Sequence, residues 1–331
     1  MKLKFFIFFI IGFASTSSLN AENLGLNAKP LGFGDWRCGG ISIAESFVPG
    51  LGYLINEDFD KAIVFGSLKW GALINYTQAT QNENYQEDYN DTIEHKSSDE
   101  SESGKEELNF YYNKSTYDAS LYGTIYQNLM SLTIYDHYAH ACQKNTDTYW
   151  RLSDPLNIPH YWDKWYFWLV FGMAMIPLDD DVNYNYYLGD GLTEEYMRSN
   201  ALPQYYIVGI GEETFFRGVL QSFFQELYKG WSYSEKASWH LGVFTASAVF
   251  GMAHAGIGIQ ATALQAFVMG LYFGYVYQPN PNTYDIITAS AIHSWWDIII
   301  TYKILNKAEF RESDSPIKNK KFTLLNLQHS F

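Results

Sequence analysis

The chain has 331 residues, of which 47% are hydrophobic, so it is long enough for one large domain or two small ones. Its formal net charge is −14, and no Lys/Arg cluster with interleaved aromatic residues occurs, which excludes a nucleic-acid-binding protein. The mean hydropathy of −0.20 conceals a strong segregation of polar residues. Residues 237–284 contain no Asp, Glu, Lys or Arg, whereas residues 81–107 hold ten acids against two bases. The polar and apolar residues are therefore segregated into distinct segments of the chain.

The N-terminus has the order of a secretory signal. Lys2 and Lys4 precede an apolar stretch, residues 5–14, and small polar residues follow. An apolar stretch of about ten residues is too short to cross about 30 Å of hydrocarbon. We therefore predict that residues 1–21 are a signal peptide, with an uncleaved N-terminal anchor as the alternative.

The first half of the chain alternates between apolar and polar stretches. Residues 22–80 are expected to form an apolar N-terminal helical region, in which a Pro-Gly-x-Gly turn links two helices and residues 62–77 form a short membrane helix. Residues 81–115 are acidic and poor in aliphatic side chains, which predicts a disordered loop. Residues 116–203 are expected to add membrane helices at 117–135 and 165–178, followed by a polar loop.

The second half of the chain shows a regular succession of predicted helices. A helix is expected to begin after Pro203 and end near residue 228, and further apolar helices are predicted at 239–254, 257–277 and 286–305. Each approaches the roughly 20 residues that a membrane-spanning helix needs. The segment 306–331 is basic, which favours a cytoplasmic C-terminus. We therefore predict an all-α fold: a polytopic membrane helical bundle with a disordered acidic loop, in the bacterial inner (cytoplasmic) membrane.

Three apolar helices carry ionisable residues, which are costly at bilayer depth unless they pair or serve a function. On the first, Glu213 and Arg217 are four residues apart and can pair on one face. Glu212 points elsewhere, between apolar neighbours, where a carboxyl group can exchange protons near neutral pH. Alternatively, Glu212 reaches an interface or bonds a neighbouring helix.

The other two helices carry histidines. His254 ends the charge-free helix, four residues after Phe250, and His293 precedes Asp297 by four residues on the last helix. Each could be a satisfied core residue or a separate buried pair. If the three helices converge, Glu212, His254 and His293 could activate water as general bases. A Zn²⁺ site is the alternative, with His254, His293 and Asp297 as ligands and Glu212 or water completing the shell.

The spacing of these residues resembles the three-motif signature of the CPBP family, which comprises type II CAAX prenyl proteases and bacteriocin-processing (Abi) intramembrane proteins. The motifs are Glu-Glu-x-x-x-Arg, Phe-x-x-x-His and His-x-x-x-Asp, within residues 204–305, which we take as the CPBP-like catalytic core. The resemblance implies an all-helical membrane core and glutamate-dependent peptide hydrolysis without a cofactor.

Residue by residue, the resemblance implies that Glu212 and His254 activate the attacking water, and that His293 and residue 297 stabilise the oxyanion. Glu213, Arg217 and Phe250 would give structural support. Many family members have Asn at position 297, whereas this chain has Asp, which accepts but does not donate a hydrogen bond when ionised. Asp297 is therefore either protonated or orients His293.

These observations predict an intramembrane endopeptidase that contacts the lipid bilayer and cleaves a polypeptide substrate. Two alternatives stay open. One is a zinc-dependent membrane metalloprotease that uses the same side chains. The other is a non-catalytic immunity or scaffold protein that retains the fold, and the long region before residue 204, which lacks the signature, is its main support.

Overall fold

The computed structural model of the chain is mostly helical, in agreement with the expected fold class, and describes residues 36–55, 57–85, 94–96, 106–137, 152–178, 182–254 and 261–312. The predicted signal peptide or anchor at residues 1–21 lies outside this part. The first helices are α2 (Trp36–Phe47), α3 (Leu51–Ile55), α4 (Phe59–Thr80), α5 (Lys114–His137) and α6 (Trp165–Ala174). They are followed by α7 (Glu194–Glu213), η7 (Thr214–Gln221), α8 (Ser222–Gly230), α9 (Glu235–Ala253), α10 (Ala261–Tyr277) and α11 (Ile286–Lys307).

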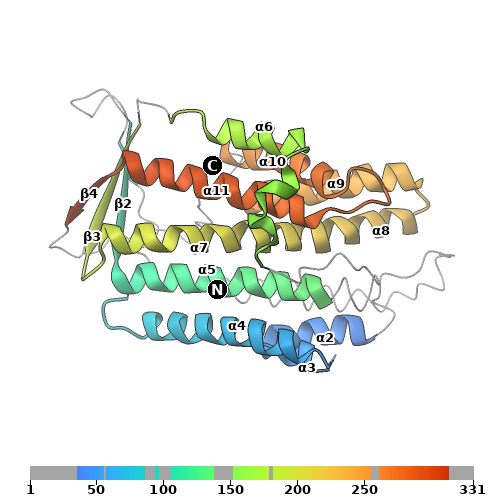
Figure 1. The fold of residues 1–331 in the computed structure, drawn as a ribbon, viewed down its shortest axis with the longest axis horizontal. Coiled ribbons are helices and arrows are strands. Elements are labelled where there is room, and N and C mark those ends of the chain that lie inside the picture. Colours follow the sequence, from blue (N-terminus) through green and yellow to red (C-terminus); the bar gives the residue numbers. More distant parts are fainter. Residues whose placement is uncertain are drawn as a thin grey trace.

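The helices lie side by side along the long axis of the molecule (Figure 1). α5 packs between α4 and α7, and α7 packs against α11 on its other side. α9 pairs with α8 and with α10. Two short 3-10 helices, η5 (Asp154–Leu156) and η6 (Ile158–Tyr161), precede α6. Among the described residues, no helix has both the length and the apolar character that crossing a bilayer requires.

A four-stranded sheet at one end of the bundle was not expected (Figure 1). Its order is β1 (Glu94–Lys96), β2 (Glu106–Asn113), β3 (Val182–Gly189), β4 (Glu309–Glu312). β1 pairs antiparallel with β2, and the other pairs are parallel. Aromatic side chains in register stabilise the sheet, because Phe110 stacks on Tyr186 and Tyr111 on Tyr187. Two strands thus lie in the segment 81–115, which we expected to be a disordered loop, and β3 lies in the polar loop expected after α6.

One continuous helical rod, composed of α7, η7 and α8, extends from Glu194 to Gly230. It begins well before Pro203, where the sequence had suggested a start. The side chain of Thr193 caps the helix by accepting a hydrogen bond from the main-chain N–H of Tyr196, and two acids occupy the first turn. The stabilisation from this cap and from the two acids compensates for the main-chain hydrogen bond that is lost at Pro203, which has no N–H to donate inside the helix.

Candidate active site

Glu212 lies near the middle of this rod, where it faces two histidines from other helices. Its Oε2 is 3.8 Å from Nε2 of His254 and 3.8 Å from Nε2 of His293. Its side chain is 25% exposed, and Oε2 itself is buried without a hydrogen-bond partner among the described residues. A separation of 3.8 Å is too long for a direct hydrogen bond, and it allows both groups to bind the same water. The structure thus brings together the acid and the two imidazoles that the motifs singled out.

His254 follows α9 directly, and its ring orientation is fixed by its own helix. Nδ1 lies 2.8 Å from the carbonyl oxygen of Phe250. Because a carbonyl only accepts, Nδ1 carries the proton of this hydrogen bond, and in the neutral ring Nε2 is then the acceptor. The acceptor nitrogen therefore faces Glu212. The ring of Phe250 also contacts the imidazole, with centroids 4.3 Å apart.

His293 is fully buried on α11 and is held by Glu213, the acid next to Glu212. Nδ1 of His293 lies 2.7 Å from Oε1 of Glu213, and Oε2 of Glu213 is 3.1 Å from Nε of Arg217. The three side chains form a chain of ionic contacts in which Glu213 connects the rod to α11. Sequence spacing predicted the Glu213–Arg217 pair, but it could not reveal the contact with His293, because nothing in the sequence relates residues 80 positions apart.

Aromatic rings enclose these charges. The guanidinium carbon of Arg217 lies 4.5 Å from the ring centre of Phe250 and 5.5 Å from that of Phe273. Such cation–π contacts offset part of the lost hydration of a buried cation. Phe273 also stacks on the ring of His293, with centroids 4.8 Å apart and planes at 13°. Phe250 was expected to give structural support, whereas Phe273 carries no sequence signal beyond its place in an apolar helix.

Asp297 is the fourth predicted residue. Its Oδ2 lies 3.5 Å from Nε2 of His293, one turn away on α11, and the residue is 8% exposed. Asp297 therefore faces the same ring nitrogen that faces Glu212, whereas Glu213 takes Nδ1. An ionised carboxylate in this position stabilises positive charge on the imidazole.

The backbone around Glu212 departs from the α-helix immediately after the two acids. η7 is a π-helix of eight residues that begins at Thr214 and contains Arg217. The hydroxyl of Thr214 donates to the carbonyl oxygens of Ile210 and Gly211, both at 2.9 Å, where the hydrogen-bond pattern changes. π-helical turns often mark functional sites because they redirect side chains. The apolar periodicity of the sequence did not reveal this turn.

Two glycines of α7 let other helices approach the acids closely. A Cβ atom at Gly209 would lie 2.4 Å from the main-chain nitrogen of Ser294 on α11, and one at Gly211 would lie 2.3 Å from Oδ1 of Asn128 on α5. Only hydrogen fits in such spaces. The short distance between α7 and α11 is what allows Glu213 to reach His293.

Gly209→Ala is therefore expected to push α7 and α11 apart and to lower the free energy of unfolding by about 1–3 kcal/mol. Gly71→Ala is the matched control, since its new Cβ would meet nothing within 4 Å on α4; it should be neutral or stabilise by about 0.4–1 kcal/mol. Denaturant unfolding of both variants in detergent measures the difference. Equal stability of the two variants would contradict the proposed close packing.

Metal ligation finds no support in the geometry. In the part of the chain that the structure describes, no group of three or more His, Cys, Asp or Glu side chains is arranged to hold a metal ion. The zinc alternative, with His254, His293 and Asp297 as ligands, therefore lacks a ligand set there.

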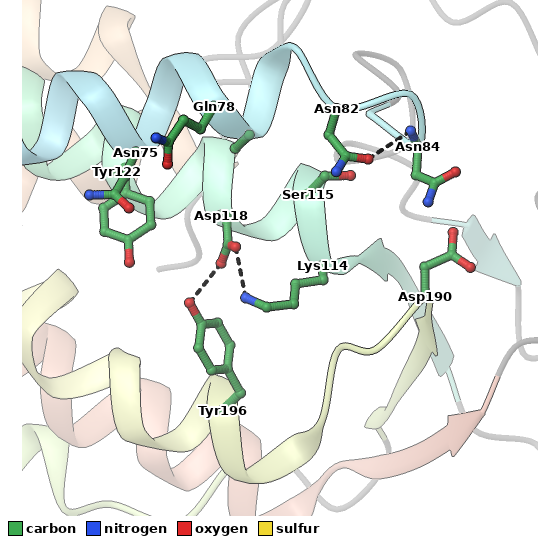
Figure 2. A pocket seen from close by; sticks show the side chains of 11 residues that line it. Asn75, Gln78, Asn82, Asn84, Lys114, Ser115, Asp118, Tyr122, Asp190 and Tyr196 are labelled. Atoms are coloured by element: carbon green, nitrogen blue, oxygen red, sulfur yellow. Dashed lines mark hydrogen bonds and ion pairs between the residues drawn. The ribbon is translucent and has the colours of Figure 1, made fainter.

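A polar hollow of about 420 Å³ lies elsewhere, where the end of α4 faces the first turns of α5 and α7 (Figure 2). Both oxygens of Asp118 are occupied in it, one by Lys114 at 2.7 Å and one by Tyr196 at 2.8 Å. The predicted site residues are not among the residues that line it. This hollow is thus separate from the Glu212 site.

Comparison with known proteins identifies the part of the chain that contains this site. Residues 194–299, about a third of the chain, match the family model described as type II CAAX prenyl endopeptidase Rce1-like. No curated protein and no solved structure gives a match. The matched segment begins at the first residue of α7 and contains all the site residues described above, and the family consists of hydrolases that cleave polypeptides. The segment that holds the candidate site is therefore similar to the Rce1-like type II CAAX prenyl endopeptidase domain.

Proposed function

We propose that the protein is an intramembrane endopeptidase in which Glu212 and His254 activate the water that attacks the scissile peptide bond. The observation that carries this proposal is the position of Glu212 Oε2, 3.8 Å from a ring nitrogen of each histidine. Water held by Glu212 and by the acceptor nitrogen of His254 gives up a proton to Glu212 as its oxygen bonds to the carbonyl carbon. Glu212 then passes this proton to the leaving amine as the C–N bond breaks.

His293 has the complementary role in this proposal. Its Nδ1–H is bound to Glu213, and the carboxylates of Glu213 and Asp297 favour a ring that also carries a proton on Nε2. That N–H donates to the oxyanion of the tetrahedral intermediate, a contribution worth about 3–4 kcal/mol per donor in soluble proteases. Asp297 supports the charge on His293 and is not itself a donor to the oxyanion.

A membrane location is supported by the outer faces of the bundle. α4 and α6 lie on opposite sides of it (Figure 1), and both expose large apolar side chains, as does α10. These side chains include Ile63, Val64, Leu68, Trp70, Ile74, Trp165, Leu169, Met173, Leu264 and Val268. Large apolar side chains exposed together on the outer face of a helix are typical of surfaces that contact lipid or another protein. We place these faces in lipid, in the bacterial inner membrane, with the basic segment 306–331 in the cytoplasm.

The test uses purified protein in detergent and a set of fluorogenic peptides. His254→Ala should lower kcat by about 10²-fold or more, because the water loses its second anchor. His240→Ala is the matched control: His240 lies on α9, is partly exposed, and its Nδ1 bonds the hydroxyl of Tyr275 at 3.0 Å. Cleavage by the native protein should persist in a chelator. Loss of cleavage in chelator would favour the zinc alternative, and absence of any cleavage by the native protein would favour a non-catalytic membrane protein.

A further inference from the structure

A second set of buried ionisable side chains lies outside the matched domain, where α2, α3, α4 and α5 meet. Glu45 and Lys69 are both fully buried and form an ion pair. The carboxylate of Glu45 also accepts hydrogen bonds from the main-chain N–H groups of Gly50 at 3.0 Å and Gly52 at 2.7 Å. His137 adds a third ionisable group, with Nε2 3.7 Å from Oε2 of Glu45.

The set continues along α5. Nζ of Lys69 donates to the hydroxyl of Thr133 at 3.0 Å. One turn further, Asp136 accepts from Nζ of Lys61 and from the hydroxyl of Tyr53, both at 2.9 Å. We call these residues the Glu45 cluster: Glu45, Tyr53, Lys61, Lys69, Thr133, Asp136 and His137. Sequence reasoning missed it, because its members are scattered over four helices without a recognised spacing.

A contribution to folding stability does not by itself explain the Glu45 cluster. Removing charges from water is expensive, and apolar residues of similar volume often give equal or greater stability. What buried ion pairs can supply is a unique arrangement of the elements that carry them, since a displaced helix would leave charges without partners. The cluster fixes the end of α5 relative to α2, α3 and α4.

α5 in turn contacts the rod on both sides of the catalytic motif. Asn128 occupies the space above Gly211, the residue before Glu212, and a Cβ atom at Gly218 would lie 2.3 Å from the ring of Tyr135. Gly218 directly follows Arg217 in η7. Tyr135 itself is fully buried and lies between Thr133 and Asp136 of the Glu45 cluster. The turn of α5 that the cluster holds is therefore also the turn that packs on η7.

We propose that the Glu45 cluster is a positioning site: it holds α5 against Gly211 and Gly218 and thereby sets the position of Glu212 and Arg217. This role rests on the proposed peptidase function. Its members lie on α2, α3, α4 and α5 rather than on the rod, so this role acts on the reaction only through the packing of α5 against the rod. A displacement of about 1 Å at a reacting group can cost about 10²-fold in rate.

Glu45→Gln keeps the side-chain volume and removes the charge opposite Lys69. We expect kcat to fall at least about 10-fold with KM unchanged, together with faster amide hydrogen exchange in residues 209–218. Glu83→Gln, at an exposed acid beyond the end of α4, should change neither value. Because an unpaired Lys69 could prevent folding, the double variant Glu45→Gln/Lys69→Met is measured alongside; it leaves no unpaired charge, and the same two changes are expected.

A double variant that folds, cleaves at the native rate and exchanges normally over residues 209–218 would overturn the proposal. The exchange measurement needs no catalysis. If the native protein cleaves no peptide, the peptidase function fails on that result alone, whereas unchanged exchange in the variants specifically rejects the positioning role.

Discussion

Glu212→Gln should lower kcat by about 10²–10⁴-fold, the usual contribution of a general base. Glutamine keeps the shape of the side chain but cannot take a proton from water at neutral pH. The thermal unfolding midpoint should hardly change, because Oε2 of Glu212 accepts no hydrogen bond among the described residues. Peptide cleavage and thermal unfolding of the same preparation measure both quantities.

The matched control is Glu226→Gln. Its side chain is 25% exposed, as is that of Glu212, and it lies on the same rod, paired with Lys229 at 2.7 Å. It should retain native kcat. Equal activity of the Glu212 and Glu226 variants would reject the assignment of Glu212 as the base.

Glu213→Gln should have the largest effect on stability. The amide can still accept a hydrogen bond from Nδ1 of His293, but it leaves the guanidinium of Arg217 fully buried without its carboxylate. Removing one partner of a buried ion pair costs about 3–5 kcal/mol, a large part of the 5–15 kcal/mol that most proteins have. Adding Arg217→Met should restore much of this loss.

An exposed pair on the same helix is the control. Glu194 and Arg198 are also four residues apart, at 2.7 Å, with side chains 46% and 28% exposed. Glu194→Gln should change the free energy of unfolding by less than about 1 kcal/mol. Denaturant unfolding of all three variants in detergent gives the comparison. If Glu194→Gln and Glu213→Gln lower the free energy of unfolding by similarly small amounts, burial does not strengthen the Glu213–Arg217 pair.

Helix positions were predictable because apolar stretches end at strong local signals. The helix expected at 239–254 is α9, which begins after the capping residue Ser234, and the helix expected at 286–305 is α11, which begins after the capping residue Asp285. The strands were not predictable. β2 and β3 come from polar, acidic or Tyr/Asn-rich stretches, and their stability depends on pairing between residues some 76 positions apart, such as Phe110 and Tyr186.

The sequence predicted which residues approach one another at the candidate site, but it did not predict the contacts between them. Apolar surroundings made Glu212, His254 and His293 conspicuous, and the structure brings them together. Their catalytic roles stay predictions. The contact between Glu213 and His293, the π-helix and the Glu45 cluster depend on how separate helices pack, which residue spacing along one helix does not encode.

The sheet has a consequence for biosynthesis. β2 leads directly into α5, β3 precedes α7, and β4 follows α11, so these three helices of the bundle are each connected to one strand of the same sheet. β4 is synthesised after the other three strands, and it pairs with a strand made more than a hundred residues earlier. Such distant contacts form slowly. A nascent chain can therefore bring α11 and His293 into their final position only after β4 has been synthesised.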